Sequence, residues 1–309
     1  MKKLIYIAVA MAITACAAND SLEGAAEGPQ ELTFTSGIES RVSDDMWVAG
    51  DKIGVHTLDF TVVMETGEME YVDNNVCLVA DYGGSSTTFS LTEGFSPIFL
   101  PDSSPIYFVL AAYYPYISGN DDPETCVFDI SDQTDLSAVD YMTALAYITT
   151  SGVTSVNFAF EHVHCRVKFT IKASDSVPSL EGMEFNLSNI QTIGIPGEDT
   201  SDYSALARYG YIDEVTIDFA DDYSSATVEL ILFPTDGNIT NAYLYLTIDG
   251  QYYVAPFATT LSSGRQQNYT VTLGEDQTTI SGATITAWGE SDDNDDIIPT
   301  PDDSNTTFE

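Results

Sequence analysis

Apolar and polar residues alternate in many short segments of this chain, and such alternation is typical of strands with one buried face. The clearest case is residues 155–173 (SVNFAFEHVHCRVKFTIKA), which we interpret as a pair of strands. Further strand segments are separated by turn signals such as Gly83-Gly84 and Asp249-Gly250. Tyrosine, phenylalanine, threonine and valine are frequent, as they are in sheets. The chain is therefore expected to be all-β and antiparallel.

Two blocks of these strands flank residues 174–180 (SDSVPSL), which have the composition of a domain boundary. We predict two antiparallel β-sandwich domains in tandem, over residues 46–173 and 174–289. A short helix is expected only within residues 135–147. No glycine-rich nucleotide-binding loop lies between a strand and a helix, which argues against an α/β enzyme core.

The first sixteen residues, MKKLIYIAVAMAITAC, have the order of a secretory signal peptide. Two lysines precede an apolar stretch too short to span a bilayer, and a small residue stands directly before Cys16. We interpret residues 1–15 as a lipoprotein signal peptide and Cys16 as the lipidated residue. An ordinary signal peptide, with Cys16 incidental, is the alternative. Either reading predicts export, and the first predicts a lipid anchor in a membrane.

The charge of the chain limits its partners. Nine basic and 48 acidic side chains give a formal net charge of −39, and removing Lys2 and Lys3 with the signal peptide brings it to −41. Such a surface repels nucleic acid and anionic lipid, so neither is an expected partner. The acidic residues are interspersed with apolar ones, so the chain can still bury cores.

Cysteine and histidine residues were considered as candidate sites. Cys77, Cys126 and Cys165 remain once Cys16 is lipidated, and their spacing matches no zinc site. A disulfide between Cys77 and Cys126 suits an oxidising compartment, but sequence does not establish it, and buried thiols are the preferred interpretation. His162 and His164 have the spacing to share one face of a strand and bridge a metal. Their phenylalanine neighbours favour a structural role instead.

Aromatic and acidic clusters give no stronger signal of chemistry. Tyr113, Tyr114 and Tyr116 suit a sugar-stacking platform. Tyr114 and Tyr116 share one side of the expected strand while Tyr113 opposes them, and ordinary sandwich packing explains this at least as well. No pair of carboxylates stands out as a hydrolase site, and no acidic segment has the spacing of an EF-hand calcium loop. We expect no enzymatic activity, no cofactor and no metal.

Residues 16–45 combine a polar tether with the first strand of the mature chain. Within residues 31–40, Leu32, Phe34 and Ile38 share one face of the expected strand, and Arg41 follows in an exposed-looking segment. Residues 290–309 are acidic and contain two prolines, so a disordered tail is expected there. Trp47 and Trp288 are both predicted to be buried.

Several segments, taken in order along the chain, resemble the fimbrillin family, the subunits of type V pili on Gram-negative anaerobes. They are the lipobox at Cys16; Arg41 followed by Trp47 and Gly50-Asp51-Lys52-Ile53-Gly54-Val55; Tyr114-Pro115-Tyr116; Asp140-Tyr141-Met142; Phe158-Ala159-Phe160-Glu161-His162 leading into Val167-Lys168-Phe169; Gly264-Arg265; Tyr269-Thr270-Val271; and Ile285-Thr286-Ala287-Trp288. Each segment is weakly specific alone, and their order is what carries the resemblance.

The resemblance implies two transthyretin-like β-sandwich domains, no enzymatic activity, and export to the outer membrane as a surface lipoprotein. It also implies that an arginine-specific protease cuts after Arg41 and that the first strand then leaves. A donor strand from a neighbouring fimbrial subunit would fill the groove in which Leu32, Phe34 and Ile38 had been held. An ordinary surface arginine is the alternative reading of Arg41.

The C-terminal end departs from this pattern, because a donor strand should alternate apolar residues. After Trp288 the chain offers only Ile297, Ile298 and Phe308 among aspartates and prolines. The sequence therefore favours a tip or anchor subunit over a repeating stalk subunit. A surface lipoprotein that does not polymerise, and that binds a glycan or host ligand through its sandwich loops, is the alternative function.

Overall fold

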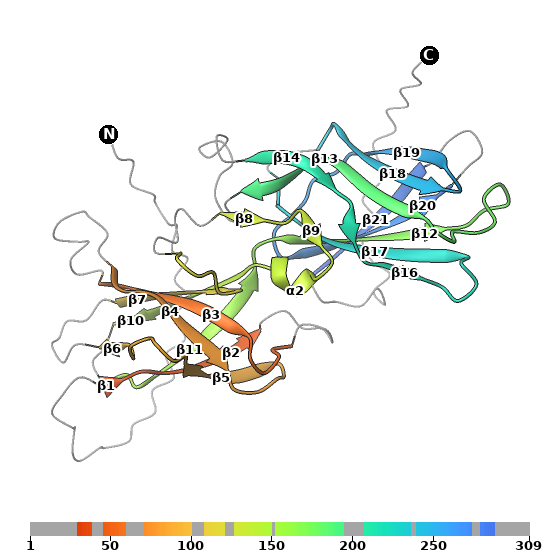
Figure 1. Ribbon diagram of the computed structural model, residues 1–309. Helices are drawn as coiled ribbons and strands as arrows, with labels where there is room; N and C mark the ends of the chain where they lie inside the picture. The colour runs from red at the N-terminus through yellow and green to blue at the C-terminus, as the bar shows by residue number, and fades with distance from the viewer. Residues whose placement is uncertain are drawn as a thin grey trace, which may run out of the picture.

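In the computed structural model, the residues described are 30–38, 46–59, 71–100, 108–120, 127–149, 152–194, 207–235, 239–273 and 279–287. Strands dominate the regular structure of these residues, which confirms the all-β class (Figure 1). The helix expected within residues 135–147 is a single turn, α2 (Leu136–Val139), and most of the remaining residues form a strand. Asp135 caps α2, because its Oδ1 accepts a hydrogen bond of 3.1 Å from the backbone of Ser137.

In the N-terminal part, seven strands close into a barrel in the order β10-β11-β2-β5-β4-β3-β7. These strands are β2 (Thr33–Ile38), β3 (Lys52–Asp59), β4 (Tyr71–Ala80), β5 (Ser86–Leu91), β7 (Phe108–Tyr114), β10 (Met142–Ile148) and β11 (Ser155–His162). Two short strands, β1 (Gln30–Glu31) and β6 (Phe99–Leu100), pair separately. A closed barrel leaves no free sheet edge while every strand is in place.

Trp47 lies in the barrel core, with 2% of its surface exposed, and so confirms the prediction made for it. Its ring meets Phe89, Tyr114 and Phe160 edge-on, with ring centroids 5.3, 5.6 and 5.3 Å away. Aromatic rings prefer such edge-to-face contacts over direct face-to-face stacking. Trp288, the other predicted core tryptophan, lies outside the described residues.

The segment from Gly50 to Val55 forms a turn and the start of β3. Gly50 has φ +100°, a turn conformation that suits glycine, and the side chain of Asp51 accepts a 2.8 Å hydrogen bond from the Val48 backbone. At Gly54, an added Cβ would collide with the ring of Tyr113, so glycine lets that ring lie against the strand. The glycines of this motif therefore serve a turn and a close packing contact.

In the C-terminal part, two five-stranded sheets share one core. The first sheet contains β12 (Cys165–Lys172), β16 (Ile217–Phe219), β17 (Ser225–Leu232), β20 (Arg265–Thr272) and β21 (Thr279–Ala287). The second contains β8 (Phe128–Asp129), β13 (Glu184–Gly194), β14 (Arg208–Ile212), β18 (Ala242–Ile248) and β19 (Gln251–Phe257). A further pair is β9 (Asp132–Gln133) with β15 (Glu214–Val215). Phe169 of the first sheet contacts Phe185 and Phe257 of the second, as in a β-sandwich.

The chain passes from the N-terminal core to the C-terminal core at a different place from the boundary expected at residues 174–180. Strands β11 and β12 were expected to belong to one domain, but β12 pairs with β17 and β20, in the C-terminal sheet. The change therefore falls between His162 and Cys165. Both strands alternate in the same way, and alternation shows which residues are buried without showing which strand is the partner.

The segment 127–139, which connects two barrel strands, packs into the C-terminal core. Phe128, Ile130 and Val139 belong to that core. The buried amide of Gln133 donates to the carbonyls of Ile130 and Ile231 at 2.7 and 2.9 Å, and accepts from the Ile231 backbone at 2.8 Å. A satisfied buried amide of this kind fixes the segment against β17.

Candidate functional site

The first described strand of the barrel is the main candidate site, because the N-terminal end of the chain supplies it. Strand β2 lies between two partners, β11 and β5. It runs parallel to β11, with Thr33 opposite Ser155 and Ile38 opposite Phe160. It runs antiparallel to β5, with Phe34 opposite Phe89. Both of its edges are therefore used in the sheet.

Side chains on one face of β2 enter the barrel core. Leu32, just before the strand, and Phe34 are each 4% exposed, as predicted from their shared parity. The ring of Phe34 stacks on that of Phe158, with centroids 5.7 Å apart and planes inclined by 3°. The third predicted contact, the side chain of Ile38, lies outside the described residues. Burying a leucine and a phenylalanine contributes about 1.5–3 kcal/mol each.

The opposite face and the start of β2 are held by polar contacts. The Leu32 backbone donates to the carbonyl of Ile98 at 3.0 Å. The backbone N–H and the hydroxyl of Thr33 both donate to the carbonyl of Thr154, at 2.9 and 3.0 Å. The hydroxyl of Thr35 donates to Oδ1 of Asn157 at 3.0 Å. Backbone ladders of this kind bind any extended chain, whereas the buried side chains select its register.

A single chain break after β2 would separate it from the rest of the barrel. Its departure would leave β11 and β5 with unpaired backbone groups beside an apolar slot. Such an edge accepts a new strand that alternates apolar residues. Arg41 and Cys16, the predicted processing and lipidation residues, lie outside the described residues.

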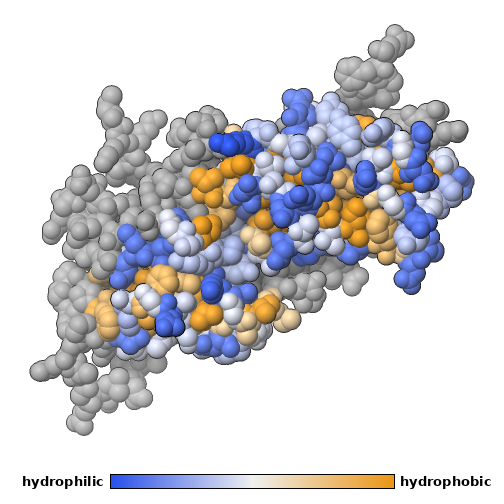
Figure 2. Space-filling view, in the orientation of Figure 1, coloured by the Kyte–Doolittle hydropathy of each residue, from blue (hydrophilic) through white to orange (hydrophobic). Residues whose placement is uncertain are grey.

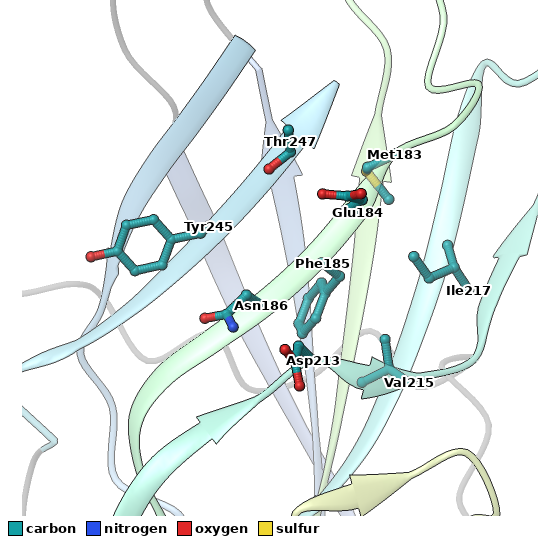
Figure 3. Close-up of a pocket in the computed structure, with 9 residues that line it drawn as sticks. All are labelled: Met183, Glu184, Phe185, Asn186, Asp213, Val215, Ile217, Tyr245 and Thr247. Atoms are coloured by element: carbon teal, nitrogen blue, oxygen red, sulfur yellow. The ribbon is translucent and has the colours of Figure 1, made fainter. Parts of the chain in front are cut away.

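A second candidate site is a pocket of about 500 Å³ in the C-terminal part (Figure 3). It opens where the chain passes from β14 through Asp213 to β15 and β16. Strand β14 pairs with β13 only from Leu187 onward, so the first residues of β13 line the pocket. The lining residues are Met183, Glu184, Phe185, Asn186, Asp213, Val215, Ile217, Tyr245 and Thr247.

Two of the three tyrosines considered as a sugar platform, Tyr113 and Tyr114, are core residues, whereas Tyr116 is half-buried. Tyr113 and Tyr114 are 3% and 8% exposed. The hydroxyl of Tyr113 donates to Oδ1 of Asn75 at 2.6 Å and lies 3.1 Å from the carbonyl oxygen of Ile117. The packing interpretation is therefore the correct one for these two residues.

The two histidines occupy separate settings. His162 ends β11 and its Nδ1 is 2.8 Å from Oδ1 of Asp140, whereas His164 lies in a bend and its Nδ1 donates to the carbonyl of Val139 at 3.1 Å. Within the part of the chain that the structure describes, no three histidine, cysteine, aspartate or glutamate side chains gather closely enough to hold a metal ion. Cys77 and Cys165 are buried free thiols, as the preferred interpretation predicted.

Burial lowers the pKa of His164 to about 3, because the imidazolium would lose its hydration among the surrounding rings. An unfolded histidine has a pKa near 6.5, so the unfolded chain binds a proton that the folded chain excludes. Stability from this residue is complete above pH 6.5 and is lost as pH falls below it, by about 1.4 kcal/mol per pH unit. The urea midpoint should therefore decrease from pH 7 to pH 5 by more in the wild type than in His164→Asn. Equal decreases in the two proteins would contradict this account.

Across the described ranges, no helix has the length and apolarity needed to cross a membrane. The sequence matches the fimbrillin-like family over residues 40–288, a match that begins just after β2. It is 32% identical, over 173 residues, to the candidate fimbrium subunit Fim1C of Bacteroides uniformis, a match that covers 54% of each chain. The chain thus spans about half the length of this curated relative.

Two solved structures of candidate cell adhesion proteins have a similar fold. The one from Bacteroides uniformis gives a TM-score of 0.64, and the one from Bacteroides ovatus gives 0.63. Each is 22% identical to this chain and covers 86% of it, with all of the solved chain matched. Since the family match extends over most of the sequence, the chain belongs to the fimbrillin-like family.

Proposed function

We propose that this protein is a subunit of a cell-surface fimbrium that joins other subunits by strand exchange after proteolysis near Arg41. The observation that carries the proposal is the place of β2, which the N-terminal end supplies and which lies between β11 and β5 in the closed barrel. Leu32 and Phe34 hold it there through apolar contacts that another alternating strand can reproduce. Membership of the fimbrillin-like family supports assembly with other fimbrial subunits.

We propose further that each core is a transthyretin-like domain and that the subunit acts as a tip or anchor. The support for the second point is the composition of residues 290–309, in which apolar residues are too few and too interrupted to form an alternating donor strand. A subunit that accepts a strand but donates poorly would occupy one end of a filament. Its surface function would be structural rather than enzymatic.

The membrane attachment of the subunit is proposed to be a diacylglyceryl thioether at Cys16, on the outer membrane. Each buried methylene of an acyl chain contributes about 0.8 kcal/mol to membrane binding. Cys16→Ser should therefore shift the expressed protein from the membrane fraction to the soluble fraction. Ala17→Ser, a similar change beside the lipidation residue, should leave it in the membrane. If the two variants were found in the membrane fraction in equal amounts, the proposed lipid anchor would be contradicted.

The proteolytic step has a direct test, because the chain contains four arginines. Arg166, Arg208 and Arg265 lie in strands β12, β14 and β20, where backbone hydrogen bonds protect against cleavage. An arginine-specific protease should therefore cut first after Arg41. The cut protein should lose stability, form oligomers that resist SDS, or bind an added alternating peptide, because its slot is open.

Arg41→Lys should block the cut and all three outcomes, whereas Arg208→Lys should block none of them. Cleavage at a strand arginine while Arg41 stays intact would contradict the proposal. So would a cut protein that remains monomeric with an unchanged melting temperature, because the first strand would then be dispensable.

A further inference from the structure

Tyrosines gather on the outer face of the sheet formed by β14, β13, β18 and β19. On β18, Leu244 and Leu246 point into the core, so Tyr243 and Tyr245, which alternate with them, point outward. The pairing of the strands sets them in rows with outward residues of the neighbouring strands. One row is Tyr211, Ser188, Tyr243 and Pro256; the next is Asn186, Tyr245 and Val254; the third is Glu184, Thr247 and Tyr252. We call these residues, together with Tyr209, the tyrosine face.

The tyrosine face exposes much of its aromatic surface. Tyr209, Tyr211 and Tyr252 are 68%, 61% and 77% exposed, and Tyr243 is 39% exposed. The rings of Tyr243 and Tyr245 lie next to each other, with centroids 6.3 Å apart. A tyrosine ring offers an apolar surface and a polar hydroxyl at once, which is typical of recognition sites. On the side displayed in Figure 2, hydrophobic residues lie in several groups among hydrophilic ones.

The pocket of Figure 3 continues the tyrosine face, since Tyr245, Thr247, Glu184 and Asn186 belong to both. Asn186 and Tyr245 are directly opposite each other on neighbouring strands. Asp213 comes from the connection after β14 and adds a second carboxylate to the pocket. The combined surface therefore places amide, hydroxyl and carboxylate groups beside exposed rings.

We propose that the tyrosine face and its pocket bind a neutral glycan. A sugar ring has an apolar C–H face that stacks on an aromatic ring and a rim of hydroxyls that bond to amides and carboxylates. Adjacent strands lie about 4.8 Å apart, so Tyr211 and Tyr243, separated by one strand, are roughly 10 Å apart at their backbones. That spacing suits stacking contacts with two hexoses of one chain that are separated by a third.

Charge decides between this ligand and others. The first two rows carry no charged side chain, and the pocket adds two carboxylates and no basic group. Sialylated, sulfated or uronic glycans would be repelled there and by the net charge of −39. A second copy of the same chain would meet like charge as well. A neutral glycan has no such penalty.

The proposal is tested on uncut full-length protein, so its outcome is independent of cleavage at Arg41. Cellohexaose, mannohexaose, laminarihexaose and xylohexaose form the neutral set, and a heparin hexasaccharide and oligogalacturonate form the anionic set. Calorimetric titration should detect binding to at least one neutral member and to neither anionic member. Tyr245→Ala should weaken that binding about tenfold, the loss of one stacking contact. Asn186→Ala should weaken it as well.

Tyr147→Ala is the matched control, because Tyr147 is 57% exposed on β10 of the barrel. It should leave glycan binding unchanged, and all variants should keep the wild-type urea midpoint. The proposal is overturned if no neutral member binds, if anionic members bind as well, or if Tyr245→Ala and Tyr147→Ala have equal effects. A protein ligand captured through the same tyrosines, without glycan binding, also overturns it.

Discussion

Trp47→Ala should lower the free energy of unfolding by about 3–5 kcal/mol, the usual cost of truncating a buried tryptophan. Three aromatic neighbours, Phe89, Tyr114 and Phe160, surround its ring and come from three different strands of the barrel. The truncation would leave a cavity that these rings fill only in part. With a typical urea dependence of 1–3 kcal/mol per molar, the urea midpoint of the barrel should fall by at least about 1 M.

Val48→Ala is the control for this experiment, because Val48 is the next residue and is 65% exposed. Its free energy of unfolding should stay within about 0.5 kcal/mol of the wild-type value. If Trp47→Ala were as mild as Val48→Ala, the ring could not be the centre of a packed core. Trp47→Phe should recover part of the loss, since a smaller ring keeps some of the edge-on contacts.

Residue parity made much of the barrel predictable from sequence. Leu32 and Phe34 were assigned to a buried face by alternation alone, and both are buried. Trp47 was predicted to be buried because no polar contact explained its exposure, and it is buried too. These predictions depend on one strand and its two faces, which is the information that a local pattern contains.

The sequence is less informative about which strands pair with each other. Strand β12 alternates as β11 does, but it pairs across the sheet with β17, more than fifty residues away. The pattern predicted no strand over residues 127–134 and a short helix within residues 135–147, yet segment 127–139 packs into the other core through Phe128 and the amide of Gln133. Long-range pairings of this kind depend on loop closure and on the shapes of both surfaces, neither of which is encoded locally.

The tyrosine face was missed for a related reason. Tyr211, Tyr243 and Tyr252 are spread over more than forty residues, and each alone reads as an ordinary strand residue. Only the register of β14, β13, β18 and β19 brings them to one surface. A signal was present in the outward positions of β18, where two tyrosines alternate with buried leucines, but single-strand alternation does not distinguish a recognition surface from solvent-exposed polar residues.

Phe34→Asp should release β2 from the barrel while the chain remains uncut. The new carboxylate would replace a ring stacked on Phe158 at a position that is 4% exposed, and a charge buried without a partner is strongly unfavourable. The strand can avoid this cost by leaving its slot, which would cost the burial of Leu32 as well. We expect a loss of at least about 3 kcal/mol in stability, measured by urea unfolding.

Thr33→Asp is the matched control, because Thr33 is on the same strand, faces solvent and loses only the hydroxyl bond to Thr154. It should cost about 1 kcal/mol. A synthetic peptide of residues 30–40 should bind to Phe34→Asp and restore part of its stability, because the open slot offers the unpaired edges of β11 and β5. The same peptide should not bind to Thr33→Asp, whose slot is still occupied. Equal stability of the two variants would show that the barrel does not depend on β2. A peptide that binds neither variant would show that the slot does not accept an added strand. In either case, strand exchange at this slot would have no basis.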